Sequence, residues 1–272
     1  MTDIEFGLSM RRSDDVAAQA RQIEELGYDY ATSGEHVFFH VPVSNAFISL
    51  AVAAGATSTL KLMSTITLLP LYPAVLAAKQ AAALDVASGG RFNLGVGVGG
   101  ELPKEFEASG VPVTERGART NEALEVMRRL FTEDDVHFEG RFTTLSGVTL
   151  APKPTQKPGP PVWISGRKDA AWKRAARYGD AWLPYMYTPE MLVESNERIA
   201  ELGLTGLLPS VSVSCNNHEG ANPAIKVQQW DGAKWVTKTD WIPSMTDVVR
   251  PLMEKDAAQY ASVKGISPRS CN

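Results

Sequence analysis

The chain has 272 residues, a formal net charge of −4 at pH 7 and 44% hydrophobic residues. These values are sufficient for a packed core in one large α/β domain or in two small ones. The net negative charge argues against the basic surfaces that bind nucleic acids or anionic membranes, so we expect neither partner. The acidic start of the chain and the shortness of the apolar run 68–78 argue against a secretory signal and a membrane-spanning helix, which favours a cytoplasmic protein.

Six short apolar segments alternate with helical patterns in the first two thirds of the chain. The predicted strands cover residues 4–10, 28–32, 60–69, 91–96, 162–164 and 181–183. The predicted helices are one that follows a cap at Ser13 or Asp14, and those at 46–56, 73–88, 116–131 and 169–178. This alternation predicts a parallel sheet, and the number of strands favours a TIM-type (β/α)8 barrel over an open doubly wound sheet.

Apolar spacing predicts which helix faces are buried. The inward residues are Val16, Ala20, Ile23 and Leu26 in the first helix and Leu124, Met127 and Leu130 in the helix 116–131. The proline-rich segment 151–161 has two interpretations, a linker between domains or a stiff approach to a barrel strand. We prefer the second, because the segment leads straight into the apolar strand at 162–164.

Polar and glycine-rich residues follow four of the predicted strands. They are the segment 33–36, Thr67, the segment 98–100 and the segment 165–167. Because the carboxyl ends of barrel strands meet at one mouth, we expect these residues to converge there. The sequence therefore predicts a site at this mouth.

The glycines of the fourth strand match a dinucleotide-binding fingerprint, Gly95-x-Gly97-x-x-Gly100. That site needs a helix directly after the motif, but Glu101-Leu102-Pro103 interrupts a long helix there, and the motif does not follow the first strand. A cofactor loop at a barrel mouth is the preferred interpretation. A glycine turn that serves tight packing remains the alternative.

Two further motifs carry candidate chemistry. His36 and His40, with Glu35 beside them, have the spacing of a metal pair on a helix, but this segment is predicted to be a strand end and loop, so we expect no metal. His36 suits an acid/base at the mouth because its usual pKa lies near neutrality, and a structural histidine is the alternative. The segment 165–167 precedes a helix, so it is either a phosphate cradle or a simple capping turn.

Four runs of the sequence resemble the luciferase-like monooxygenase superfamily, and they are most similar to its deazaflavin branch, which uses coenzyme F-420. They are ITLLPLYPAVLAAKQAAALDVASGGRFNLGVGVG, FEASGVPVTERGARTNEALEVMRRLF, APKPTQKPGPPVWISG and RAARYGDAWLP. The resemblance covers about residues 4–195. It implies a TIM-type barrel with a flavin or deazaflavin across its mouth.

The resemblance also implies roles for particular residues. The cofactor ring would pack against a bulge at Ile66 and Thr67, where members of the family often have a non-proline cis peptide. The ring would be lined by Val98, Gly99 and Gly100, and the phosphate would be held by Ser165, Gly166 and Arg167. Glu35 and His36 match an acid–histidine pair, with His36 as the proton partner beside the hydride-transfer carbon.

The chain after about residue 200 resembles another family, the C-terminal end of periplasmic branched-chain amino-acid-binding proteins of ABC importers. The runs are GLTGLLPSVSVSCNNHEGANP, VQQWDGAKWV and AAQYASVKGISPRSC. Patterns predict a strand at 210–214, a hairpin at 225–239 that turns on Asp231-Gly232, and a helix at 247–264. Cys215 and Cys271 would suit a disulfide in an exported protein.

The two resemblances together describe a mosaic chain. Its predicted parts are a barrel portion, residues 1–198, and an atypical segment, residues 199–272, and the barrel is expected to be incomplete or irregularly closed unless that segment supplies its last strands. The predicted function is a coenzyme F-420-dependent oxidoreductase that moves hydride to or from a small organic substrate. The alternatives are an FMN-dependent monooxygenase fed by a reductase partner, and a chimeric chain that lacks catalysis or binds an amino acid. A homodimer is left open.

Overall fold

The structure is a computed structural model, in which the chain divides into two compact units, residues 3–185 and 186–272. It describes residues 5–10, 14–188, 191–192, 194–195 and 198, and the strand segments 212–214, 217–221, 224–225, 228–230, 235–237 and 242–243. The predicted boundary between residues 198 and 199 stays a prediction.

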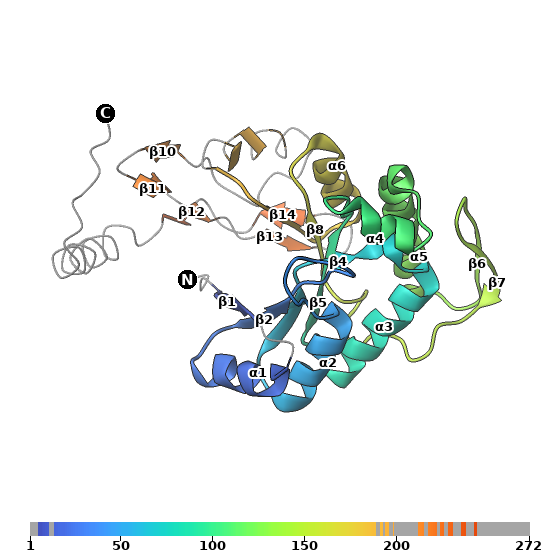
Figure 1. The fold of residues 1–272 in the computed structure, drawn as a ribbon, viewed down its shortest axis with the longest axis horizontal. Coiled ribbons are helices and arrows are strands. Elements are labelled where there is room, and N and C mark those ends of the chain that lie inside the picture. Colours follow the sequence, from blue (N-terminus) through green and yellow to red (C-terminus); the bar gives the residue numbers. More distant parts are fainter. Residues whose placement is uncertain are drawn as a thin grey trace. The chain divides into compact units, whose positions relative to one another are not determined.

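The first unit is built on one curled sheet of parallel strands (Figure 1). The strand order is β1 (Gly7–Ser9), β2 (Tyr30–Ser33), β3 (Lys61–Ser64), β5 (Phe92–Gly97), β8 (Val162–Ser165) and β9 (Ala181–Leu183). A short β4 (Thr67–Leu68) pairs with β5, and every pairing in this sheet is parallel. The six predicted strands are confirmed in position, except that the third, predicted at 60–69, is divided into β3 and β4. The described strands of this unit form part of a barrel rather than a closed one.

Helices connect these strands and pack side by side along the sheet (Figure 1). They are α1 (Val16–Glu25), α2 (Ala46–Ala56), α3 (Ala74–Ala87), α5 (Arg116–Thr132) and α6 (Asp169–Tyr178). Neighbours along the row are in contact, from α1 through α2, α3 and α5 to α6. Crossover helices of this kind are what parallel strands require, so the predicted βα alternation is confirmed.

Local signals explain several of the helix ends. The side chain of Asn45 accepts the N–H of Ile48 at 3.1 Å and caps α2. Gly89, with φ of +67°, lies just beyond the end of α3. The prediction for the first helix was wrong at one position: α1 ends at Glu25 as the chain turns toward Gly27, so Leu26 is 63% exposed.

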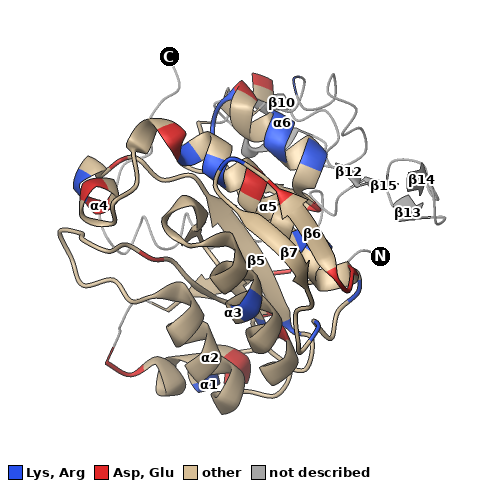
Figure 2. Cartoon of the chain, turned by 90° about the vertical axis from the view of Figure 1, so that its right-hand side faces the viewer, with Lys and Arg blue, Asp and Glu red and all other residues tan. Residues whose placement is uncertain are grey.

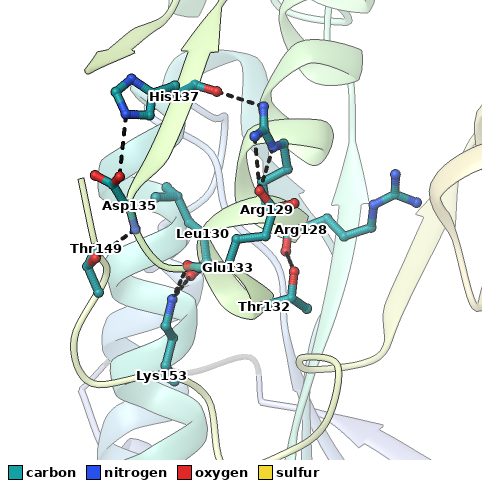
Figure 3. A network of polar contacts seen from close by, with 9 residues as sticks. All are labelled: Arg128, Arg129, Leu130, Thr132, Glu133, Asp135, His137, Thr149 and Lys153. Atoms are coloured by element: carbon teal, nitrogen blue, oxygen red, sulfur yellow. Dashed lines mark hydrogen bonds and ion pairs between the residues drawn. The ribbon is translucent and has the colours of Figure 1, made fainter. Parts of the chain in front are cut away.

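Further elements of the first unit were not predicted. The helix α4 (Pro103–Ala108) and the 3-10 turns η1 (Leu69–Leu71) and η2 (Val113–Glu115) shape the loops after β4 and β5. The strands β6 (Val136–Glu139) and β7 (Thr144–Val148) form a separate antiparallel hairpin that contacts α5. Arg129 of α5 ties this hairpin to the helix end, because it pairs with Glu133 at 2.9 Å and donates to the carbonyl of His137 at 2.8 Å (Figure 3).

The proline-rich segment 151–161 lies within the first unit and leads directly into β8. Its anchor is Gln156, whose backbone N–H donates to the fully buried carboxylate of Asp85 at 2.9 Å and whose side chain donates to it at 2.6 Å. Asp85 belongs to α3. The interpretation as an approach to a barrel strand is therefore confirmed, and a linker between the two units is excluded.

The second unit contains short antiparallel pairs. They are β10 (Ser212–Ser214) with β11 (Asn217–Ala221), β12 (Ala224–Ile225) with β15 (Ile242–Pro243), and β13 (Gln228–Trp230) with β14 (Trp235–Thr237). The strand β10 lies within the predicted strand at 210–214. The pair β13–β14 confirms the predicted hairpin at 225–239. The turn at Asp231-Gly232, the helix predicted at 247–264 and both Cys215 and Cys271 lie outside the described residues.

Candidate active site

Four segments that follow strands lie along the carboxyl edge of the sheet. Register places Ser33 level with Ser64, and Thr67 level with Val96, which in turn is level with Ile164. The segments 34–36, 65–67, 98–100 and 165–167 therefore follow neighbouring strand ends in order across β2, β3, β5 and β8. The structure brings the sequence-predicted residues to one edge.

His36 lies at this edge with one end of its ring held by the protein. Its Nδ1 atom is 3.1 Å from both carboxylate oxygens of Glu105, and its ring stacks on Phe39 with 4.2 Å between centroids and 9° between planes. The His36 side chain is 24% exposed. Its Nε2 atom has no hydrogen-bond partner among the described residues, so this atom is available to a bound molecule.

Glu105 is a functional candidate that the sequence analysis missed. Its buried carboxylate also accepts the N–H groups of Val37 at 2.6 Å and Phe38 at 3.2 Å. Glu105 belongs to α4, so this helix fixes the loop that carries His36. The available signal was Pro103 followed by an acid two residues later, which is the pattern of a helix start.

Glu35 has a different environment from its neighbour. Only 7% of the residue is exposed, and its carboxylate accepts the N–H groups of Leu68 at 2.7 Å and Ala46 at 3.3 Å. The hydroxyl of Tyr72 and the amide of Asn45 also donate to it. Burial raises the pKa of the Glu35 carboxyl although these hydrogen bonds oppose the rise. Through the hydrogen bonds of its carboxylate, Glu35 links the end of β2 to α2 and β4.

The bulge between β3 and β4 packs tightly on the glycines of β5. The Thr65–Ile66 peptide is cis. A Cβ atom on Gly97 would overlap the side chain of Ile66, and one on Gly95 would overlap the carbonyl of Ser64. These two glycines therefore serve close packing, which was the alternative interpretation of the motif.

The glycines after β5 adopt left-handed conformations. Gly99 has φ of +59° and faces Leu68 and Phe106, while Gly100 has φ of +105° and faces Arg116. Together with Val98 they are partly exposed at the edge. No helix begins directly at Gly100, since α4 starts at residue 103, so the structure does not support a dinucleotide fingerprint here.

The segment after β8 turns sharply before α6. Gly166 has φ of +149°, its Cβ would overlap Ala171, and its carbonyl accepts Trp182 Nε1 at 2.9 Å. Arg167 lies 3.7 Å from a carboxylate oxygen of Glu101. Its guanidinium also lies 5.5 Å from the ring centre of Tyr185.

The residues along this edge fit the flat ring of a cofactor. Ile66, Val98, Gly99 and Gly100 present small or apolar surface, and the hydroxyl oxygen of Thr67 is buried without a hydrogen-bond partner. A pocket of about 380 Å³ lies at the ends of β1 and β2; it reaches Thr65 of the bulge but is lined by none of the residues just named. Its lining residues include no charged side chain; they are Ser9, Met10, Val16, Ser33, Gly34, Val41, Pro42, Val43, Ser44, Ser49 and Thr65.

The structure offers no support for a metal at His36. His40 is exposed and its ring packs against Phe39 at a centroid distance of 3.9 Å. The described ranges contain no group of three or more His, Cys, Asp or Glu side chains that could hold a metal ion. Among the helices described, none is long and apolar enough to cross a membrane.

A curled parallel sheet with helices outside it and a histidine site at the strand carboxyl ends defines an α/β protein of the TIM-barrel type. The family model of the luciferase-like monooxygenases matches residues 5–204. The chain belongs to this family. Its members are flavin- or deazaflavin-dependent oxidoreductases or monooxygenases.

Individual relatives differ in their cofactors. An uncharacterised protein of Mycobacterium tuberculosis is 30% identical over 213 residues, which are 74% of this chain and 73% of that protein. The FMNH2-dependent dimethylsulfone monooxygenase of Pseudomonas putida is 34% identical over 59% of this chain and 46% of its own length.

Two solved structures share the fold of this chain and have different activities. An F420-dependent secondary alcohol dehydrogenase, solved with an F420-acetone adduct, has a TM-score of 0.66 and 26% identity over 74% of this chain and 64% of its own. The monooxygenase RslO1 from Streptomyces bottropensis has a TM-score of 0.65 and 27% identity over 74% of this chain and 66% of its own. The matched region thus spans less than two thirds of each solved relative, and both F420 and FMN occur among the relatives.

Proposed function

We propose that this protein is a coenzyme F-420-dependent oxidoreductase that moves hydride between the deazaflavin and a small organic substrate. The observation that carries the proposal is His36, whose Nε2 is unpartnered among the described residues at the strand edge while Nδ1 is held by a buried carboxylate. The deazaflavin supplies the hydride acceptor or donor when it is bound. The residues of this chain supply binding, orientation and proton transfer.

The residues that would hold the cofactor follow from their places along the edge. Ile66 and Thr67 would support one side of the ring, and Val98, Gly99 and Gly100 the other. The backbone N–H groups of Ser165, Gly166 and Arg167 lie before α6, where the helix dipole favours a phosphate. Arg167 would add a charge-assisted hydrogen bond once it leaves Glu101, with which its contact is long and exposed.

His36 and Glu35 have separate roles in this proposal. His36 would exchange a proton with the substrate oxygen through Nε2, since an imidazole nitrogen can both accept and donate a proton. Glu35 would act through position alone, because its carboxylate oxygens are occupied by backbone and side-chain donors. We therefore keep His36 as the acid/base and propose Glu35 as a residue that holds the loop before it.

An FMN-dependent monooxygenase is the second candidate. It is favoured by the identity of 34% with the FMNH2-dependent dimethylsulfone monooxygenase over 167 residues. This activity would require a reductase partner that delivers reduced flavin. Titration of the purified protein with oxidised coenzyme F-420 and, separately, with FMN distinguishes the candidates. We expect fluorescence quenching with micromolar affinity for F-420; tighter binding of FMN supports the second candidate, and binding of neither contradicts both.

The outer face of α2 supports a homodimer. Its exposed residues, Ile48, Ala51, Val52 and Gly55, are all apolar, and Leu76 of the adjacent α3 is 56% exposed. Figure 2 shows α2 and α3 mostly without charge, whereas α5 and α6 carry bands of both signs. A second copy that presented the same face would remove this apolar surface from water.

The C-terminal segment gives rise to the remaining alternatives. We propose the boundary near residue 198, the likeness of the segment to an amino-acid-binding protein and a cytoplasmic location as expectations that solution experiments can test. If the segment made a chimeric chain without catalysis, the purified protein would bind neither cofactor. A rise in melting temperature with a branched-chain amino acid would favour the binding function, and we expect no rise.

A further inference from the structure

We propose that Glu105 is a positioning residue that holds His36 in the tautomer with its hydrogen on Nδ1, and so makes Nε2 the nitrogen that exchanges protons. This inference rests on the role proposed for His36, but the tautomer itself can be measured without turnover. Glu105 lies 69 residues from His36 in the sequence and reaches it from α4.

The hydrogen bonds of Glu105 define which atom carries the hydrogen. A carboxylate has only acceptors, and its Oε1 atom already accepts Val37 N–H at 2.6 Å and Phe38 N–H at 3.2 Å. His36 Nδ1 lies 3.1 Å from Oε1 and from Oε2. Since the carboxylate has no hydrogen to donate, Nδ1 must be the donor. In the neutral ring, Nε2 then carries the lone pair.

Burial of Glu105 makes the loss of its contact with His36 more costly than the loss of a surface ion pair would be. The side chain of Glu105 is 2% exposed, and within the described residues its recorded partners are His36 and the two N–H groups that follow it, with no Lys or Arg among them. A desolvated carboxylate without these donors would be costly. The loop 36–38 and the helix α4 therefore hold each other, and the histidine ring is fixed with them.

The orientation of the ring has a second support. Phe39 stacks almost parallel to the imidazole, at 9°, so rotation of the ring would lose this contact. With the ring plane fixed by Phe39 and Nδ1 fixed by Glu105, Nε2 is directed away from both. In this carboxylate–histidine pair, the carboxylate stabilises the tautomer that has its hydrogen on Nδ1.

The test replaces Glu105 with glutamine. In Glu105→Gln, the amide oxygen can still accept Val37 and Phe38, while the amide nitrogen can donate to Nδ1. We therefore expect the neutral ring to change to the tautomer with hydrogen on Nε2. Nitrogen-15 NMR of histidine-labelled protein reads the two ring nitrogens directly, and comparison with His36→Gln assigns one signal set among the four histidines.

A matched control and a second variant complete the experiment. Glu107→Gln changes an exposed acid on the same helix and should leave the His36 signals unchanged. A Glu105→Gln protein whose His36 keeps its hydrogen on Nδ1 overturns the proposal. Glu105→Asp is a second variant, in which the retained carboxylate should preserve the original tautomer.

Turnover separates this proposal from the proposed function. Glu105→Gln should lower turnover by about 10²-fold with near-normal cofactor affinity, and should add little to His36→Ala in the double variant, because the two residues act as a unit. If the wild-type protein bound neither cofactor, the proposed function would fail while the tautomer result would stand. Additive losses in the double variant would contradict action through His36.

Discussion

The side chain of Ile66 occupies the space that a Cβ atom on Gly97 would need, so the bulge after β3 approaches β5 as closely as glycine allows. Gly97→Ala should displace Ile66 and lower the free energy of unfolding by about 1–3 kcal/mol. Cofactor affinity should fall with it, because Ile66 supports the proposed ring site. Urea denaturation and cofactor titration measure the two effects. Gly55→Ala, in an open position of α2, is the control and should be neutral or stabilising.

A second prediction concerns the acid/base. His36→Ala should reduce turnover by about 10²-fold or more and leave the cofactor dissociation constant largely unchanged, because the ring contacts the reacting end and not the phosphate end in the proposed arrangement. Steady-state kinetics and fluorescence titration provide the comparison. His137→Ala removes a histidine of β6 whose side chain is 68% exposed, and it should keep full turnover. Equal losses in both variants would argue against a special role for His36.

Glu35 should act on stability rather than on the chemical step. Glu35→Ala leaves the N–H groups of Leu68 and Ala46 without their acceptor, so we expect a loss of about 2–4 kcal/mol in the free energy of unfolding. Thermal and urea denaturation measure it. Glu25→Ala, at an exposed position of α1, should change stability little. If Glu35→Ala were as stable as the wild-type protein but had lost turnover, Glu35 would have a catalytic role instead.

Glu24 should make folding stability sensitive to acid. Burial alone would raise the pKa of this carboxyl, but N–H groups of residues 58–60 donate to it and lower the pKa to about 2, from 4.5. The stabilisation is therefore complete above pH 4.5 and is lost as the pH falls toward 2. Urea denaturation of Glu24→Gln across this range should show a flatter dependence on pH than the wild-type protein.

The apolar face of α2 can be tested by charge. Ile48→Asp places a carboxylate on that face, and like charges would meet across a two-fold interface. If the protein is a dimer through α2, sedimentation should show a shift to monomer at equal concentration. Arg177→Asp on α6, which lies on another face of the unit, serves as the charge-changing control. A dimer that survives Ile48→Asp must use a different surface.

The sequence predicted the parallel sheet and most helix bounds because they depend on local patterns. The helix 46–56 has a capping asparagine before it, and the helix 169–178 follows a glycine turn; both have the predicted bounds. The hairpin β6–β7 was missed because its strands are short and mostly exposed, with only Val136 buried among their residues. Leu26 was misplaced because apolar spacing continues one residue past the end of α1.

The candidate site was predicted only where it depends on strand ends. His36 and the glycines follow strands, so their common edge could be inferred from the order of elements. Glu105 could not be placed in this way, since its partner is 69 residues away and the helix that carries it was not predicted. The interlocking of Gly97 with Ile66 was open to two interpretations, and three-dimensional proximity alone distinguished them.

Glu105 on α4 holds the loop that begins at His36. The loop after β2 and the loop after β5 therefore act as one unit that has to be transferred together. A graft that transferred the loop after β5 from a relative without the loop after β2 would separate the carboxylate from its histidine. Recombination between family members should therefore succeed when residues 36–45 and 101–108 come from the same parent. The proton chemistry at His36 would then depend on both loops together, so neither loop could change freely without the other.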